Sequence, residues 1–192
     1  MAITSAEILT YVNDRLGMTL TDIDTYLMDV LEPLSKRGRF IPAEADIAFT
    51  DGEATVACPT DYLFLQALHI EDHEPMDLIS IQDYNWAIRN QSTISEGIPT
   101  EYAVWNKTIY PYPVPDDSYT GKLKYYKLHA HSATVAFDDR FRNAIQKGVT
   151  AQVAEKHEMW ELAKLYTLEF EAEVAQLRGI QENPGFVKYH DI

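Results

Sequence analysis

Two segments of the chain, one near each end, carry apolar residues at helical spacing. The first begins with Thr4 and Glu7, whose separation of three residues is that of a capping box. It continues with apolar residues four positions apart, at Ile8, Val12 and Leu16. Because a helix turns once every 3.6 residues, this spacing places all three on one face. The pattern predicts a helix over residues 5–16, ending near Gly17.

A second helical pattern follows, with a weaker start signal at Thr21 and Asp24. Its apolar stripe consists of Ile23, Leu27, Val30, Leu31 and Leu34. Pro33 lacks an amide hydrogen, so we expect the helix to kink or stop at about Glu32 and to pass into a turn at 35–39. The turn holds the basic cluster Lys36, Arg37 and Arg39. We interpret these cations as favourable charges at the negative end of a helix dipole rather than as a phosphate site.

The longest helical pattern opens at Asp138 or Asp139 and continues to Gly179. Its apolar stripe consists of Phe141, Ile145, Val149, Val153, Met159, Ala163, Tyr166, Phe170, Val174 and Leu177. Gly148 lies within this pattern and predicts a close contact with a neighbouring element, because it has no side chain. The periodicity leaves open whether the segment is one helix or two that break near His157.

The region between the helical patterns carries strand signals. Asp51-Gly52 predicts a hairpin between two short strands within 46–58. Residues 62–70 are apolar on both faces, which is typical of a buried strand. An acidic turn is expected at 71–77, then a short extended piece, and a short helix at 82–89. Residues 90–97 are polar and are predicted to form a loop.

The stretch from Gly97 to Leu128 is rich in aromatic residues and prolines. Asn106-Lys107 lies between two alternating segments and predicts a tight hairpin turn. Three prolines follow, at positions 111, 113 and 115. Because proline cannot donate to a sheet, we expect an edge or crossover segment in extended form there. A further strand is predicted from Tyr119 to Leu128.

These patterns together predict an α+β fold in a single domain with an insertion. The expected helical core packs the N-terminal helices with the long C-terminal helices and comprises residues 1–45 and 129–179. A small antiparallel β-rich insertion is expected at 46–128, and an extended C-terminal tail at 180–192. The tail is too short to fold alone. A chain of 192 residues is long enough to bury roughly 70% of the surface that it exposes when unfolded.

The chain is acidic, with a net charge of −14 at pH 7, and residues 1–100 hold 17 acidic against 5 basic side chains. This excess repels phosphate groups, so it argues against a dedicated nucleic-acid-binding protein but not against a surface that DNA only passes. No apolar run approaches the roughly 20 residues of a transmembrane helix, and the N-terminus does not resemble a secretory signal. One cysteine fits a reducing compartment, so we expect an intracellular protein without membrane contact.

Residue types that carry chemistry do not form a recognisable site. His69 and His73 flank two acidic residues, but metal ligation by histidines four apart requires a helix, and here we expect a strand end and a turn. Cys58 is predicted to be a small buried apolar residue rather than a nucleophile. His129 and His131 are predicted to be exposed in a connection. We therefore predict no enzyme activity, catalytic residue, cofactor or metal, and a metal hydrolase using His69 and His73 stays as a minor alternative.

Aromatic side chains cluster in and around the predicted hairpin. Trp105, Tyr110 and Tyr112 could form an exposed surface that recognises a glycan or a peptide. The other interpretation is that such a cluster forms the core and the cross-strand packing of a small β-unit. The first interpretation makes the chain a binding module that uses exposed aromatic side chains.

The chain resembles the adaptor proteins that connect head to tail in tailed bacteriophages in the order of its sequence motifs. After the helical start ILTYVNDRLG and TDIDTYL, the most specific motifs are PTDYL at 59–63, GIPTEY at 97–102, YPYP at 110–113 and KYY at 124–126. The resemblance covers most of the chain. It implies a structural virion protein without catalysis, with a helical core, a β-rich insertion and a C-terminal segment that reaches a neighbouring subunit or the portal.

The resemblance also implies partners and a location. Proteins of this kind form a ring, usually of twelve copies, beneath the portal protein and present a platform to downstream tail or nozzle proteins. DNA passes through the lumen of the ring without specific binding. The location implied is the neck of the virion, between portal and tail, after assembly in the host cytoplasm. The residues expected to contact the portal or a neighbouring subunit are Phe186, Val187 and Tyr189.

Overall fold

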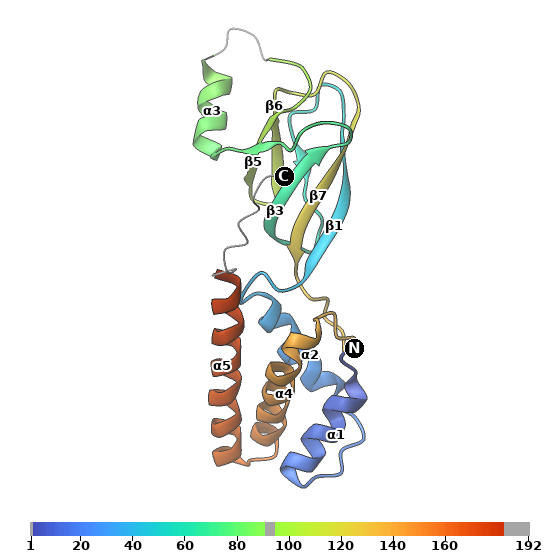
Figure 1. The fold of residues 1–192 in the computed structure, drawn as a ribbon, viewed down its shortest axis with the longest axis vertical. Helices are drawn as coiled ribbons and strands as arrows, with labels where there is room; N and C mark the ends of the chain where they lie inside the picture. The colour runs from blue at the N-terminus through green and yellow to red at the C-terminus, as the bar shows by residue number, and fades with distance from the viewer. Residues whose placement is uncertain (1, 91–94, 183–192) are drawn as a thin grey trace, which may run out of the picture. The chain divides into compact units, whose positions relative to one another are not determined.

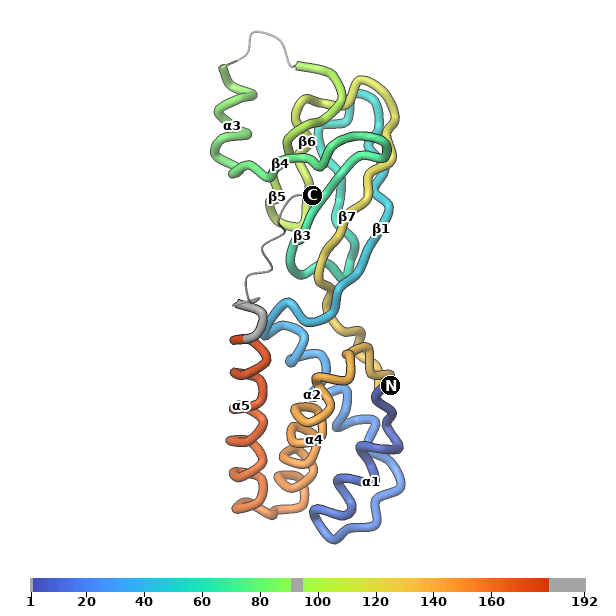
Figure 2. Tube along the Cα trace, in the orientation of Figure 1, coloured from blue at the N-terminus to red at the C-terminus, as the bar shows by residue number. Residues whose placement is uncertain are grey.

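The computed structural model describes residues 2–90 and 95–182 and divides into two compact units. The first unit is helical and is formed by residues 1–41 together with 128–192. The second unit, residues 42–127, is built mainly from strands and is called the β unit below. Among the described residues, the second unit holds every strand and one short helix, and the first unit holds the other helices, which confirms the predicted α+β class (Figures 1 and 2).

The helical unit packs around one central helix. Its elements are α1 (Ser5–Leu16), α2 (Asp24–Ser35), the 3-10 turn η1 (Asp139–Phe141), α4 (Arg142–Lys156) and α5 (Trp160–Glu182). Helices α1, α2 and α5 all contact α4, which Figure 1 shows between α1 and α5. Apolar side chains from all four α-helices and from η1 form one cluster. The N-terminal and C-terminal segments therefore share a single core.

The predicted start of α1 is confirmed by its capping box. The amide of Glu7 donates to the Thr4 hydroxyl oxygen at 3.3 Å, and the amide of Thr4 donates to the Glu7 carboxylate at 3.1 Å. Gly17 ends the helix in the left-handed conformation, with a φ of 63°. Both helix ends therefore follow from local sequence signals.

Helix α2 continues through Pro33 to Ser35, so it does not stop at about Glu32, which was one of the two expectations. Leu31 and Leu34 are fully buried in the core on either side of the proline. Pro33 has no amide hydrogen to donate to the Asp29 carbonyl, so α2 loses one helical hydrogen bond. The burial of the two leucines outweighs that loss.

The long C-terminal pattern forms two helices, α4 and α5, which answers the question that periodicity left open. The chain turns at Glu158, whose φ is 59°, and the amide of Met159 donates to the Ala154 carbonyl at 2.8 Å. Neither glycine nor proline marks this turn. Helix α5 passes the expected end at Gly179 and continues to Glu182.

The β unit consists of two sheets that enclose an apolar cluster. The three-stranded sheet has the order β1 (Pro42–Phe49), β7 (Tyr119–Lys127), β3 (Tyr62–Ile70). The four-stranded sheet has the order β2 (Val56–Ala57), β6 (Thr108–Tyr112), β5 (Glu101–Trp105), β4 (Asp77–Leu78). Leu68 and Leu123 from the first sheet share the cluster with Tyr102 and Ile109 from the second. The short helix α3 (Ile81–Arg89) follows β4.

The predicted hairpin around Asp51-Gly52 is wrong, although the chain does turn there. Gly52 has a φ of 71°, and its amide donates to the Pro115 carbonyl at 2.8 Å. The strands on either side belong to different sheets, because β1 pairs with β7 and β2 pairs with β6. The turn signal is local, whereas the choice of strand partner depends on distant residues.

The second predicted hairpin is confirmed. Asn106 and Lys107 have φ angles of 48° and 58° and join the antiparallel strands β5 and β6. Pro111 pairs with Tyr102. In an antiparallel ladder, pairs that exchange amide hydrogen bonds alternate with pairs that do not. The Trp105–Thr108 pair beside the turn is a hydrogen-bonded pair, and the Tyr102–Pro111 pair, three positions further on, is not. Pro111 therefore leaves no hydrogen bond of this ladder unmade. Strand β2 does not extend to Pro111, so β6 is locally an edge, as expected.

His129 is buried, so its predicted exposure is wrong. Its amide donates to the Ser35 hydroxyl oxygen at 3.0 Å, and its ring stacks on Phe137 with centroids 5.6 Å apart. Ring nitrogen Nε2 lies 3.0 Å from the Thr134 carbonyl oxygen. His131 is exposed, as expected, and lies 3.3 Å from the Glu32 carboxylate. His129 therefore organises the connection between the strands and α4, and no chemistry follows from it.

Candidate assembly surfaces

Helix α5 has two apolar faces. The first packs on the core through the predicted stripe, in which Ala163, Tyr166 and Val174 are buried. The second carries exposed apolar residues at Leu165, Leu168, Ala172 and Ala175. Intervals of three, four and three residues place this second set on one face, as in the seam between two packed helices. We call Leu165, Leu168, Ala172 and Ala175 the α5 stripe.

The buried face of α5 is fixed by close packing and by ion pairs. A Cβ atom at Gly148 would lie 2.9 Å from the Val30 side chain and 3.1 Å from the Phe170 ring, so α2, α4 and α5 meet where the glycine allows it. This confirms the close contact predicted at Gly148. Lys147 donates to Glu173 at 2.8 Å. The position of the α5 stripe is thus set by contacts on the opposite side of the helix.

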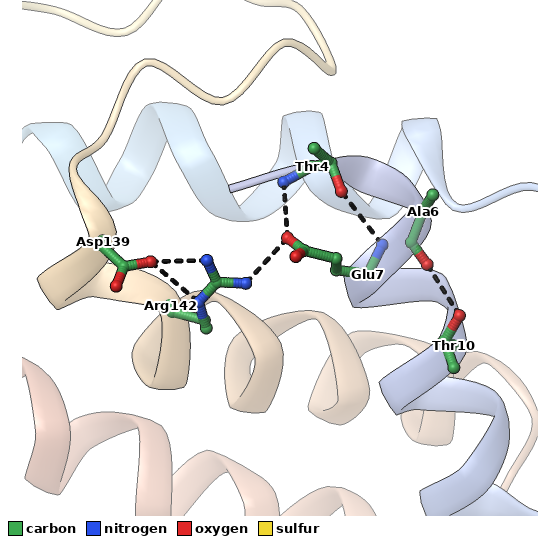
Figure 3. Close-up of polar contacts among 6 residues, drawn as sticks. All are labelled: Thr4, Ala6, Glu7, Thr10, Asp139 and Arg142. Carbon is green, nitrogen blue, oxygen red and sulfur yellow. Dashed lines mark hydrogen bonds and ion pairs between the residues drawn. The ribbon is translucent and has the colours of Figure 1, made fainter. Parts of the chain in front are cut away.

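An ion-pair network joins the start of α1 to the start of α4 (Figure 3). The Arg142 guanidinium donates to the Glu7 carboxylate at 2.7 Å and to the Asp139 carboxylate at 2.9 Å. The same Glu7 carboxylate accepts the amide hydrogen of Thr4. The hydrogen bond from Arg142 is the main reason that the pKa of Glu7 lies below its ordinary value. The network holds the two helix ends together.

An open pocket of about 710 Å³ lies where the start of α2 meets the end of α4. Tyr26 and Trp160 line it together with three carboxylates, those of Asp29, Glu155 and Glu158. One cation, Lys156, balances them in part. The pocket thus repels anions such as phosphate and gives no support to a nucleic-acid site.

The β unit brings the three predicted surface aromatics to one face. Strand pairing places Trp105 opposite Thr108, which shares a face of β6 with Tyr110 and Tyr112. The Trp105 side chain is 61% exposed. The ring of Tyr110 packs on Tyr84 of α3, with centroids 5.4 Å apart, so the helix covers part of this face. Tyr102, by contrast, is buried on the opposite face.

The remaining predicted residues do not converge. Cys58 is half-buried next to the apolar cluster, and burial raises the pKa of its thiol to about 11, which disfavours the reactive thiolate. His69 lies in β3 opposite Lys122, whereas the ring of His73 contacts Tyr119. Among residues 2–90 and 95–182, no three histidine, cysteine or acidic side chains gather as metal ligands would. Phe186, Val187 and Tyr189 lie outside the described residues.

A comparison with protein families identifies the chain. A family model described as SU10 adaptor protein matches residues 3–187. The chain belongs to the SU10 adaptor protein family. No curated protein matches it.

Membership in the SU10 adaptor protein family supports the coarser part of the sequence-based prediction. It makes the chain a structural adaptor of a bacteriophage, a component of the virion that associates with other virion proteins. It also favours a structural role over catalysis. Within the described residues, no helix combines the length and the apolarity that crossing a bilayer requires.

The α5 stripe is the feature of this SU10 adaptor family member that sequence reasoning missed. The signal was present, because Leu162, Leu165 and Leu168 recur every three residues beside the stripe that was assigned to the core. Two interleaved apolar stripes on one helix indicate contacts on two sides. Only the structure shows which stripe the chain's own core uses.

Proposed function

We propose that the chain is a head-to-tail adaptor that forms a ring, of about twelve copies, beneath the portal protein. The ring joins the portal to downstream tail or nozzle proteins and surrounds the channel through which DNA leaves the head. The observation that carries this proposal is the family match over residues 3–187. The neck position, the copy number and the partners come from the sequence resemblance.

The charge distribution agrees with this role. The net charge of −14 and the acidic pocket between α2 and α4 disfavour adhesion of DNA, as a channel wall requires. The helical unit, residues 1–41 and 128–192, builds the ring, and the β unit supplies the tail-facing or outer surface. Phe186, Val187 and Tyr189 contact the portal or a neighbouring subunit.

Imaging and mass measurement test the ring directly. Negative-stain images and mass photometry of the full chain, alone and with portal protein, are expected to show closed rings and their copy number. A chain that stays monomeric in both conditions contradicts the proposal. Cross-links from the β unit to the portal alone contradict its tail-facing placement.

A second experiment tests the C-terminal residues. Replacing Phe186, Val187 and Tyr189 by aspartate in the full chain is expected to weaken assembly with the portal and to leave the unfolding temperature unchanged. The matched control replaces Gln181, Glu182 and Asn183, which precede them, by serine. If the aspartate variant joins the portal as the unmodified chain does, the contact role of these residues is refuted.

The exposure of Trp105 favours one alternative function, a tail accessory module that recognises a glycan or a peptide. Trp105 shares one face of the β5–β6 hairpin with Tyr110 and Tyr112. Binding of the monomeric chain to a glycan array, lost on Trp105→Ala and kept on Trp86→Ala, supports this alternative. Trp86 is the suitable control because it is also exposed, on α3.

A further inference from the structure

The acidic pocket between α2 and α4 combines aromatic walls with carboxylates. Tyr26 of α2 and Trp160 of α5 line it, and Trp160 is 63% exposed although it is one of the largest apolar side chains. Asp29, Glu155 and Glu158 line the same pocket. Its volume of about 710 Å³ is within the range of sites that hold a ligand or a segment of another chain.

The pocket carboxylates differ from others in the helical unit because they lack a cation. Glu7 pairs with Arg142, and Glu171 pairs with Arg37. Across the described residues, by contrast, no lysine, arginine or histidine lies within ion-pair distance of the three pocket carboxylates, although Lys156 lines the pocket too. The pocket therefore keeps acceptor oxygens for a cation from outside.

Helix packing holds the walls of this pocket in place. Leu27 and Val30 of α2 are buried in the core, as are Val153 and Ala154 of α4. The turn that leads into α5 is closed by the amide of Met159, which donates to the Ala154 carbonyl at 2.8 Å. A preformed site of this kind costs little ordering when a partner binds.

We propose that this pocket binds an arginine side chain on a segment of a different protein. A guanidinium group is planar, so it stacks on an aromatic ring while its edge donates hydrogen bonds to carboxylates. The ammonium group of lysine has no plane that could stack on Trp160 or Tyr26. The inference does not depend on the proposed ring.

The arrangement of the carboxylates favours an extended organic cation over a metal ion. Among residues 2–90 and 95–182, no three acidic, histidine or cysteine side chains are close enough together to hold a metal. A guanidinium group with five donors can reach carboxylates that are further apart. The pocket is also larger than one side chain requires, so the backbone on either side of the arginine enters with it.

The arginines of the chain itself favour an occupant from another protein. With the exception of Arg89, every arginine interacts with a group of its own chain in the described residues. Arg89 lies in the last turn of α3. A second copy could therefore offer this one arginine, and the tests below include it.

The main test uses Trp86→Phe/Trp105→Phe, which leaves Trp160 as the sole tryptophan of the full chain. Both replaced residues are exposed, so the fold should be kept. The probe is the peptide acetyl-Gly-Arg-Gly-Arg-Gly-amide, which is expected to change the Trp160 emission to a saturating value. The same peptide with citrulline in place of arginine keeps the shape without the charge and should bind at least about 10-fold more weakly. Equal binding of the two peptides overturns the proposal.

A charge variant locates the binding. Glu155→Gln/Glu158→Gln is expected to raise the Kd of the arginine peptide by about 10-fold, measured by the anisotropy of a dye-labelled peptide. The matched control is Glu53→Gln/Glu74→Gln, which removes two exposed carboxylates from the β unit and should leave the Kd unchanged. All four side chains are exposed, so circular dichroism should not change. The same Kd in the pocket variant and the control contradicts the pocket as the site.

Trp160→Ala separates a specific pocket from a general attraction to an acidic surface. Salt screens attraction between exposed charges but affects aromatic stacking less. The Kd of the labelled peptide is therefore expected to rise in this variant at both low and high salt. If Trp160→Ala binds the peptide as the unmodified chain does, the peptide only adheres to the acidic surface and the proposal fails.

Two measurements identify the source of the cation. Spermidine that displaces the peptide at the same concentration as unlabelled peptide would indicate a polyamine site and overturn the assignment to a protein segment. Mass photometry compares the unmodified chain with Arg89→Ala. Loss of oligomers in Arg89→Ala and in Glu155→Gln/Glu158→Gln alike would identify a second copy as the occupant, which also overturns it. Weak competition by spermidine and an unchanged mass distribution in Arg89→Ala support a different protein.

Discussion

The helical unit and the β unit expose the same number of large apolar side chains in the described residues, but they distribute them differently. The β unit exposes four, which lie on separate elements or loops: Leu78, Trp86, Ile98 and Trp105. The helical unit exposes four as well, all in the first nine residues of α5: Trp160, Leu162, Leu165 and Leu168. Scattered exposure is normal for any globular protein, whereas concentrated exposure marks a contact surface. The concentrated exposure on α5 therefore distinguishes the helical unit from the β unit.

The largest expected effect is a loss of stability in the helical unit alone, caused by a substitution in its core. Phe141 is buried between Phe40 and Phe137, with ring centroids 4.8 Å and 5.0 Å away. Phe141→Ala should cost the helical unit about 4 kcal/mol by leaving a cavity. Amide hydrogen exchange should show faster exchange in α1, α2, α4 and α5 and little change in the β unit.

The matched substitution in the β unit is Leu123→Ala in β7, which should lower the stability of that unit by about 3 kcal/mol. Amide hydrogen exchange should then become faster in β1 and β3, the two strands that pair with β7, and change little in the helical unit. If either substitution accelerates exchange equally in both units, the chain unfolds as one cooperative body. That result would remove the basis for comparing the two units separately.

A smaller effect is expected where α2, α4 and α5 meet at Gly148. Gly148→Ala gains about 1 kcal/mol of helix propensity but forces the new methyl group against Val30 and Phe170, so we expect a net loss of about 1 kcal/mol in unfolding free energy. Denaturant titration measures it. Gly179→Ala is the control, because nothing lies within 4 Å of its Cβ position and only the gain should remain.

Acid should weaken the helical unit more than the β unit. In the described residues, the carboxyl groups whose pKa lies below the ordinary value all belong to the helical unit: Glu7, Glu32, Asp138 and Glu171. A hydrogen bond from a cation is the main cause in each case. Their contribution is therefore complete above the ordinary glutamate value of about 4.5 and is lost as the pH falls further.

Hydrogen exchange on either side of pH 4.5 measures this difference. Glu7→Gln/Glu171→Gln removes two of the ionisable groups, so the pH dependence of the helical unit should become shallower. An unchanged pH dependence in that variant would show that these pairs, which are largely exposed, contribute nothing measurable.

The smallest effect concerns reactivity rather than stability. With its pKa raised by burial from 9.0 to about 11, Cys58 should be alkylated by iodoacetamide about 100-fold more slowly in the folded chain than in denaturant at the same pH. Intact mass spectrometry follows the reaction. Equal rates in both conditions would show that this part of the β unit opens readily.

Local signals in the sequence predicted the start of α1 and the β5–β6 turn, because the deciding atoms lie within a few residues of one another. The Thr4–Glu7 capping box and the Asn106-Lys107 turn are of this kind. The Asp51-Gly52 turn was also located, but its strands pair with β7 and β6, more than fifty residues away. Strand partners are chosen by the whole core, which a local pattern does not contain.

The exposed face of α5 and the burial of His129 also depend on contacts that are distant in the sequence. The sequence showed that α5 is amphipathic, but not that it carries two apolar faces, of which α4 covers one. His129 was expected to be an exposed polar residue in a connection. Its burial depends on Ser35, which lies in α2, and on Phe137 beyond the loop. Neither contact is visible in the local sequence.

The pairing of β1 with β7 determines how the chain enters and leaves the β unit. Pro42, where the chain enters, is the register partner of Tyr126, one residue before it leaves. Such partners lie about 5 Å apart, so residues 42–127 join Ile41 to Leu128 as a tight turn would. A segment attached in this way can grow, shrink or be exchanged for an unrelated fold without moving the helix ends. The β unit is therefore an excursion of the chain that begins and ends at neighbouring points.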